Sequence, residues 1–381
     1  MTNIHLKALE NANKIVIKIG SSLLIDVKTG TLKQVWLDAL SADVNALIKL
    51  GKQVVIVSSG AIGLGRAQAG FAKGKLKLEQ SQASAAIGQI ALARAYENAF
   101  KPFNIQAAQI LLSLEDSENR KRYLNATNTI NTLTSLGFVP IINENDTIAT
   151  SEIRFGDNDR LAARVASMID ADMLLLLSDI DGLYTDNPQK NTNAEHIAVI
   201  KTISEQILST AGSSGSDYGT GGMVTKLLAA QISTSSGCPM IIADGRANNP
   251  INAILNGAKF SIFLSQNSIN SSRKKWLNST LDPKGSLTID KGAANALLNG
   301  KSLLSAGVAA IKGKFDNGDT LAILNLDGQV IAHGLTNYDS KDANRIIGKK
   351  SHEIADILGY AGRKNIIHRN NLVLINKNSG K

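Results

Sequence analysis

Residues 209–230 read STAGSSGSDYGTGGMVTKLLAA and change abruptly from a Gly-, Ser- and Thr-rich run into a helix-forming sequence. The spacing of the apolar residues predicts a helix that begins at Met223. The first backbone N–H groups of a helix lack partners within it, and the helix dipole makes this end positive. Lys226 follows one turn later and leans back toward the same end. We interpret this junction as a polyphosphate site; the alternative is a linker before an ordinary helix with a solvated lysine.

Four apolar runs of strand length each end abruptly in small or polar residues. The runs and the residues that follow them are 15–19 before GSS, 54–57 before SSGA, 138–142 before NEND, and 173–177 before SD. Nearly continuous apolar strands separated by helical stretches indicate a parallel sheet that is covered on both faces. Ligands of such sheets bind beyond the carboxyl ends of the strands. We therefore predict an α/β fold with its site at these ends.

Two common nucleotide-binding motifs are missing from the sequence. There is no G-x-x-x-x-G-K-[ST] loop, and Gln68 stands where the third glycine of a dinucleotide motif would follow Gly63 and Gly65. The first predicted strand instead contains Lys18. A lysine in a buried strand is costly unless it meets an anion, which favours a ligand role over the alternative of an edge strand that faces water.

Taken in chain order, the motifs resemble those of the glutamate 5-kinases within the amino-acid-kinase family. They are Lys18-x-Gly20, Ser59-Gly60-Ala61, IINEND at 141–146, GDND at 156–159, LLLLSD at 174–179 and GTGGMVTK at 219–226. The region from about residue 284 resembles a PUA domain. The resemblance implies an amino-acid-kinase-like αβα sandwich around a largely parallel sheet, followed by a small, mainly-β PUA-type barrel. The expected segments are a kinase domain at 1–270, a linker at 271–283, the PUA domain at 284–370 and a C-terminal tail at 371–381.

The resemblance implies ATP-dependent phosphorylation of the γ-carboxylate of L-glutamate to L-glutamyl 5-phosphate. This is the first step of proline biosynthesis from glutamate, and proline is the expected feedback inhibitor. A carboxylate with a reference pKa of about 4.3 is already ionised at neutral pH, so no general base is needed. Mg²⁺ is expected to bridge the phosphates of ATP. The alternatives are another carboxylate kinase of this family, or an RNA-binding protein that acts through the PUA domain.

The expected site has a catalytic, a nucleotide and a substrate part. Lys18 and Lys226 are expected to clamp the transferring phosphoryl group, with Asp179 orienting both by ion pairing, although Asp179 also suits a turn or cap. The residues expected to bind ATP are Lys18, Ser178, Asp179, Thr220, Gly221, Gly222, Met223, Val224, Thr225 and Lys226. Those expected to bind glutamate are Ser59, Asn143, Asp146, Asp157 and Asn158. Residues 157–159 could also cap the helix that follows them. No residue identifies itself as a metal ligand.

Composition agrees with two domains in a reducing compartment. A single cysteine, Cys238, excludes internal disulfides and suits the cytoplasm. The N-terminus lacks a long apolar segment, so neither a signal peptide nor a membrane span is expected. Residues 283–381 hold 14 Lys and Arg against 8 Asp and Glu, and so contribute +6 of the net charge of +9. Such a basic domain suits either RNA or plain solvation. The resemblance also implies a homo-oligomer, either a dimer or a tetramer, and contact with glutamyl phosphate reductase.

Overall fold

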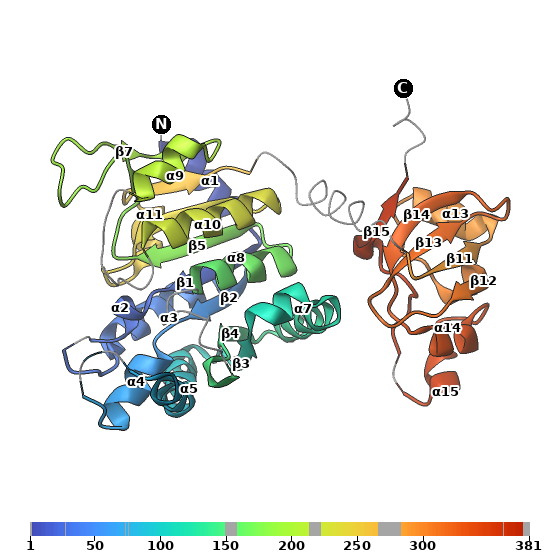
Figure 1. The fold of residues 1–381 in the computed structure, drawn as a ribbon, viewed down its shortest axis with the longest axis horizontal. Coiled ribbons are helices and arrows are strands. Elements are labelled where there is room, and N and C mark those ends of the chain that lie inside the picture. Colours follow the sequence, from blue (N-terminus) through green and yellow to red (C-terminus); the bar gives the residue numbers. More distant parts are fainter. Residues whose placement is uncertain are drawn as a thin grey trace. The chain divides into compact units, whose positions relative to one another are not determined.

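The computed structural model describes residues 2–26, 28–72, 74, 76–148, 158–212, 222–265, 283–360 and 362–375 (Figure 1). The chain divides into two compact units, residues 1–118 with 125–269, and residues 119–124 with 270–381. The predicted linker at 271–283 lies outside the described residues except for Pro283. The fold class confirms the prediction of a largely parallel α/β unit followed by a smaller unit rich in strands.

An eight-stranded sheet forms the centre of the first unit, in the order β3-β4-β2-β1-β5-β9-β10-β8. The strands are β1 (Lys14–Ile19), β2 (Gln53–Ser58), β3 (Ala107–Leu112), β4 (Val139–Glu144), β5 (Met173–Ser178), β8 (Val199–Ile200), β9 (Met240–Asp244) and β10 (Phe260–Phe263). Neighbouring strands run parallel except for the antiparallel pair β9 and β10. The four predicted apolar runs are β2, β1, β5 and β4, which lie in the interior of the sheet.

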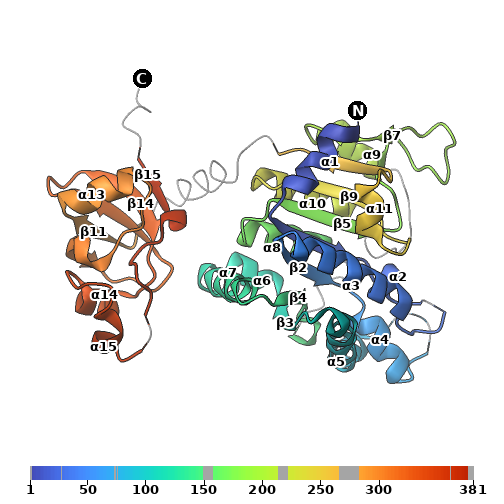
Figure 2. The same cartoon turned by 180° about the vertical axis from the view of Figure 1, so that it is seen from behind.

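Helices cover both faces of this sheet (Figures 1 and 2). They are α1 (Thr2–Asn11), α2 (Ser21–Leu24), α3 (Gln34–Lys49), α4 (Ala61–Gln68), α5 (Leu78–Phe100), α6 (Leu114–Glu118), α7 (Arg120–Ser135), α8 (Asn158–Met168), α9 (Glu205–Gly212), α10 (Met223–Ser235) and α11 (Pro250–Leu255). Helices α8 and α10 lie on the face turned to the reader in Figure 1, while α1, α3 and α11 lie on the other, seen in Figure 2. Among the described helices, none is both long and apolar enough for a membrane span.

The alternation of side chains along β1 positions the first functional residue. Ile15, Ile17 and Ile19 belong to one apolar core together with Trp36 and Leu37 of α3. Because successive side chains of a strand point to opposite faces, Lys18 must lie on the other face, which α8 and α10 cover. The alternation along β1 therefore directs the side chain of Lys18 toward the starts of α8 and α10.

The second unit is built on a five-stranded sheet in the order β12-β11-β13-β14-β15. The strands are β11 (Gly285–Ile289), β12 (Val308–Gly313), β13 (Thr320–Leu324), β14 (Val330–Leu335) and β15 (Leu372–Leu374), and the helices are α13 (Lys291–Leu298), α14 (Ser340–Ile346) and α15 (Ile354–Leu358). Only β11 and β13 pair in parallel. This strand-rich unit agrees with the mainly-β domain that the resemblance implies. Strand β15 falls in the predicted tail at 371–381, so the sheet extends further than expected.

Candidate active site

A buried ion-pair cluster of two lysines and one aspartate lies at the carboxyl end of the central strands. Lys18 lies between Val57 of β2 and Leu176 of β5 and is only 7% exposed. Its Nζ lies 2.5 Å from Oδ1 of Asp159, in the first turn of α8. The backbone of Gly20 lies close to this ammonium, because a Cβ there would lie 3.9 Å from the Nζ of Lys18.

Asp159 links β1 and the start of α10 through its two ion pairs. Its side chain is fully buried, and its Oδ2 lies 3.6 Å from Nζ of Lys226. The hydroxyl of Thr225 donates a hydrogen bond of 2.9 Å to the same carboxylate oxygen. Counted over the described residues of the cluster, two cations around one anion leave an excess positive charge in a buried place. Buried charge is costly unless it is compensated, so this arrangement favours the arrival of an anionic ligand.

The pKa directions reflect this balance of burial and charge. Burial alone would raise the pKa of Asp159, but the attraction of Lys18 and Lys226 outweighs it and holds that pKa below its ordinary value. Burial lowers the pKa of Lys226, and the charge of Lys18 lowers it further, while Asp159 opposes both effects. Asp159 thus favours the protonated form of a desolvated lysine.

Asp179 lies at the end of β5, next to Ser178. Its Oδ1 accepts a hydrogen bond of 3.0 Å from Oγ of Ser178. Among the described residues, Lys18 and Lys226 form their ion pairs with Asp159, which enters from the helix-covered face onto which Lys18 points. The expectation that Asp179 orients both lysines stays a prediction. Asp179 acts on Lys226 at longer range and favours its protonated form.

The predicted helix start at Met223 is confirmed. Gly222 caps α10, and its carbonyl accepts bonds from the N–H groups of Thr225 at 3.1 Å and Lys226 at 3.5 Å. The N–H groups of Met223 and Val224 are too near the start to find partners inside the helix. Val224 is 48% exposed, and none of the described residues comes within 4 Å of a Cβ placed on Gly222. The helix start is thus open to a ligand. Thr220 and Gly221 lie outside the described residues.

Three residues predicted to bind glutamate meet on the other side of the cluster. Nδ2 of Asn158 donates to Oγ of Ser59 at 2.6 Å and to Oδ1 of Asn143 at 3.1 Å. Ser59 and Asn158 are 99 residues apart in sequence. The Oδ1 of Asn158 is buried and has no hydrogen-bond partner among the described residues. A buried acceptor without a donor is expensive, and it therefore marks a place where a ligand could donate.

Of the two aspartates predicted to bind glutamate, Asp146 is the one that lies within the described residues. It opens the short 3-10 helix Asp146–Ile148, directly after β4. Burial raises the pKa of its carboxyl group to about 6. A carboxylate that has lost solvent, and that has no cation beside it among the described residues, is suited to a ligand ammonium. Asp157 lies outside the described residues.

Helix packing holds the Ser59 loop in place. Gly60 adopts a left-handed conformation, with φ 108°, and caps α4. The buried hydroxyl of Tyr96 in α5 donates 2.9 Å to Oγ of Ser58. Helices α4 and α5 approach so closely that a Cβ on Gly88 would lie 1.7 Å from the carbonyl oxygen of Ala61. The loop is therefore fixed by a glycine-dependent helix contact.

Sequence analysis missed Asp159 as the partner of the lysines. It is the last residue of the GDND motif, which was weighed only as a substrate loop or a helix cap. Helix α8 begins at Asn158, so these two neighbours point about 100° apart on the first turn. One contacts Ser59 and the other contacts Lys18. Two adjacent polar residues at a helix start could have indicated two separate partners.

Comparison with known proteins gives the family. Residues 13–244 match the model of the amino acid kinase family, and residues 285–358 match that of the PUA domain. Glutamate 5-kinase 1 of Rhizobium meliloti (strain 1021) is 55% identical over 97% of this chain and 93% of its own length. The chain belongs to the glutamate 5-kinase family.

Two further members of the glutamate 5-kinase family are similar over the same extent. The glutamate 5-kinase of Sinorhizobium fredii is 54% identical over 97% of this chain and 93% of its own length. That of Brucella anthropi is 53% identical over 97% of both chains. The likeness therefore covers both units of this chain.

Within the part of the chain that the structure describes, no group of three His, Cys, Asp or Glu side chains could hold a metal ion.

Proposed function

We propose that this chain transfers the γ-phosphoryl group of ATP to the γ-carboxylate of L-glutamate and forms L-glutamyl 5-phosphate. This reaction is the first step in making proline from glutamate. Relatives named glutamate 5-kinase that match nearly the whole chain support the proposal. The structural observation that carries it is the buried cluster of Lys18, Asp159 and Lys226, because its excess positive charge lies between the Asn158 side and the α10 side.

The chemistry needs positive charge more than it needs a base. The attacking γ-carboxylate is already ionised, and it must approach a polyphosphate that repels it. Lys18 and Lys226 offset this repulsion and stabilise the charge that develops on the transferring phosphoryl oxygens. Asp159 holds both ammonium groups in place before the reaction, so little reorganisation is needed when the charge develops.

The nucleotide is proposed to bind on the β5 and α10 side. The N–H groups at the start of α10 would contact its phosphates, with Gly222, Met223, Val224 and Thr225 forming that turn. Thr220 and Gly221, which lie outside the described residues, are also proposed to bind the nucleotide. Ser178 and Asp179 would flank the nucleotide at the end of β5. Mg²⁺ is proposed to arrive as part of MgATP, held mainly by phosphate oxygens and water.

Glutamate is proposed to bind on the β2 and β4 side. Its α-ammonium would donate to the unpartnered Oδ1 of Asn158 and neutralise Asp146. Asn143 and Asp157 would complete the set. Ser59 and the start of α4 would hold a carboxylate, since a helix start attracts anions. Proline shares the amino-acid head group, and we propose that it inhibits by overlapping this site. The cytoplasm, a dimer or tetramer, and contact with glutamyl phosphate reductase are proposed from the family resemblance.

Trapping of the product by hydroxylamine tests this function. The purified chain should form glutamyl hydroxamate only with ATP and Mg²⁺ present. Glutamate should be strongly preferred over aspartate and N-acetylglutamate, which separates this activity from that of other carboxylate kinases. High glutamate should relieve inhibition by proline. Hydroxamate formation with aspartate or N-acetylglutamate but not with glutamate would refute the proposal.

A further inference from the structure

Three carboxylates gather near the proposed nucleotide side. Asp179 follows the end of β5, and Asp181 lies two residues later. Asp244 ends β9, which runs parallel to β5 and pairs Asp244 with Ser178. We refer to Asp179, Asp181 and Asp244 as the acidic rim. Asp181 already has a cation beside it, because Nζ of Lys259 lies 3.7 Å from its Oδ2. Like charges repel, so the remaining carboxylates of the rim would oppose the approach of a polyphosphate if they were uncompensated.

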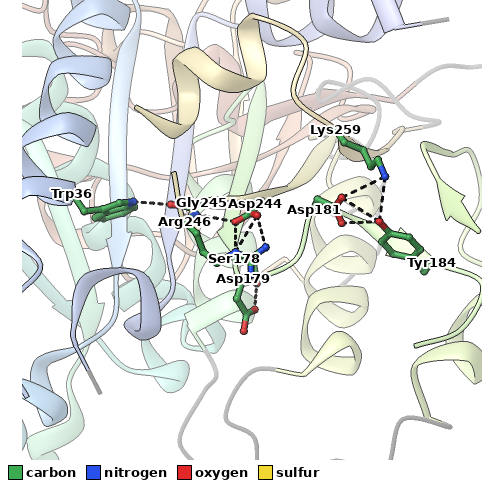
Figure 3. Close-up of polar contacts among 9 residues, drawn as sticks. All are labelled: Trp36, Ser178, Asp179, Asp181, Tyr184, Asp244, Gly245, Arg246 and Lys259. Carbon is green, nitrogen blue, oxygen red and sulfur yellow. Dashed lines mark hydrogen bonds and ion pairs between the residues drawn. The ribbon is translucent and has the colours of Figure 1, made fainter. Parts of the chain in front are cut away.

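Arg246 compensates one of these carboxylates with a well-defined geometry (Figure 3). Its Nε lies 2.9 and 3.1 Å from the two carboxylate oxygens of Asp244, and its Nη2 lies 2.6 Å from Oδ2. Such a forked contact orients the planar guanidinium group. The side chain of Arg246 is nevertheless 65% exposed, so the other edge of the guanidinium is available to a ligand. The hydrogen bonds and charge of Asp244, together with the charges of Asp179 and Asp181, raise the pKa of Arg246.

The backbone that carries Arg246 is fixed to β5. The N–H of Gly245 donates 2.7 Å to the carbonyl oxygen of Ser178, and Nε1 of buried Trp36 donates 2.7 Å to the carbonyl oxygen of Gly245. A Cβ on Gly245 would lie 2.6 Å from Cδ1 of Leu23 and 2.9 Å from Cβ of Leu177. Arg246 therefore projects from a rigid segment that is anchored to the strand of Ser178.

We propose that Arg246, oriented by Asp244, is a positioning residue for the nucleotide. Its positive charge offsets the acidic rim and attracts the phosphates of MgATP, while glutamate binds on the other side of the Lys18 cluster. This inference rests on the nucleotide side proposed above. It assigns a task to an ion pair that otherwise would be an ordinary surface contact of small energetic value.

Two variants that shift the KM for ATP in opposite directions distinguish a positioning role of Arg246 from a structural one. Arg246→Gln should raise the KM for ATP about 3- to 10-fold, as expected for loss of one partly exposed charge. Its kcat and its KM for glutamate should stay within about twofold of wild type. Asp244→Asn keeps the shape and leaves Arg246 uncompensated, so the KM for ATP should fall or stay unchanged. The double variant should return toward wild type, and Arg246→Lys should recover part of the loss.

A merely structural ion pair would give a different pattern. Breaking it from either side would then raise the KM for ATP equally, and this result would overturn the inference. The KM of wild type for ATP should also rise more steeply with KCl than that of Arg246→Gln, because salt screens the lost interaction. Thermal unfolding of each variant verifies that it is folded.

The control removes the same kind of charge from the second unit. Arg345 pairs with Asp342 at 3.6 Å, and Arg345→Gln should leave the KM for ATP unchanged. An equal rise in this control would overturn the inference by showing that net charge alone is responsible. Wild type that forms no glutamyl hydroxamate would contradict the proposed function on which the inference rests. If wild type is active and Arg246→Gln has an unchanged KM for ATP, only the role proposed for Arg246 is overturned.

Discussion

Replacing Asp159 by Asn tests whether the buried carboxylate organises the two lysines. The substitution keeps the size of the side chain but removes the charge that lies 2.5 Å from Lys18 and 3.6 Å from Lys226. At an effective dielectric constant of about 20, each attraction amounts to about 5–7 kcal/mol before the cost of desolvation. Removing one partner of a buried ion pair costs about 3–5 kcal/mol in practice. We expect Asp159→Asn to lower the free energy of unfolding by that amount.

The same change should impair catalysis and alter its pH dependence. Without Asp159 the two ammonium groups lose their fixed position, and we expect kcat to fall about 10²- to 10³-fold, as for loss of a preorganised charge-stabilising group. Asp159 also opposes the lowering of the pKa of Lys226. In Asp159→Asn the pKa of Lys226 should therefore fall further. Lys226 then loses its proton at a lower pH, so the alkaline limb of the pH–activity profile should shift to lower pH than in wild type. The pKa of Asp159 is depressed in the folded state, so its contribution to stability is present above about pH 4 and is lost on further acidification.

Urea unfolding and hydroxamate kinetics at several pH values measure these effects. Asp43→Asn is the matched control, because Asp43 is also buried but accepts hydrogen bonds from the N–H groups of Ile251 and Asn252. It should alter stability while leaving kcat nearly unchanged. An Asp159→Asn enzyme that retains more than half of wild-type kcat would refute the reasoning.

Three further predictions concern the glutamate side. Burial raises the pKa of Asp146 to about 6, so this carboxylate becomes protonated between neutral pH and pH 5, and the KM for glutamate should rise about tenfold over that range. Asp146→Asn should abolish this pH dependence. A wild-type KM that does not change with pH would contradict the prediction. Asn158→Ala should raise the KM for glutamate about 10- to 100-fold, as loss of a hydrogen bond to a charged group predicts, and an equal rise in the KM for ATP would indicate general damage. Gly88→Ala should cost about 1–3 kcal/mol of stability, because its Cβ would clash with Ala61, and an unchanged melting temperature would show that α4 and α5 can separate.

The sequence predicted the elements whose signals are local. The runs at 15–19 and 173–177 are strands because a central parallel strand is buried on both faces and therefore reads as continuously apolar. The helix at Met223 follows from glycines that give way to helix-forming residues. Strand β15 could not be found in this way, because its three residues are a strand only through pairing with β14.

The lysines and the asparagines of the site were predictable from residue type and position, but their mutual contacts were not. Asp159 and Asp179 both belong to motifs at the carboxyl edge of the sheet. Which of them meets Lys18 depends on the face from which it approaches, and that is decided by the packing of α8 against β1. The guanidinium of Arg246 likewise gains its role only when β9 pairs with β5. Such information lies in contacts between distant segments and is absent from any one motif.

Phosphoryl transfer by Lys226→Ala in a single turnover tests the central claim most directly. With glutamate saturating, and with enzyme in excess over MgATP at a concentration high enough to bind all of it, the rate reports the transfer step without product release. The account predicts a rate about 10²- to 10³-fold below wild type, with the affinity for glutamate nearly unchanged. A Lys226→Ala enzyme that transfers the phosphoryl group at more than half the wild-type rate would contradict the claim that the buried Lys18–Asp159–Lys226 cluster stabilises the transferring group.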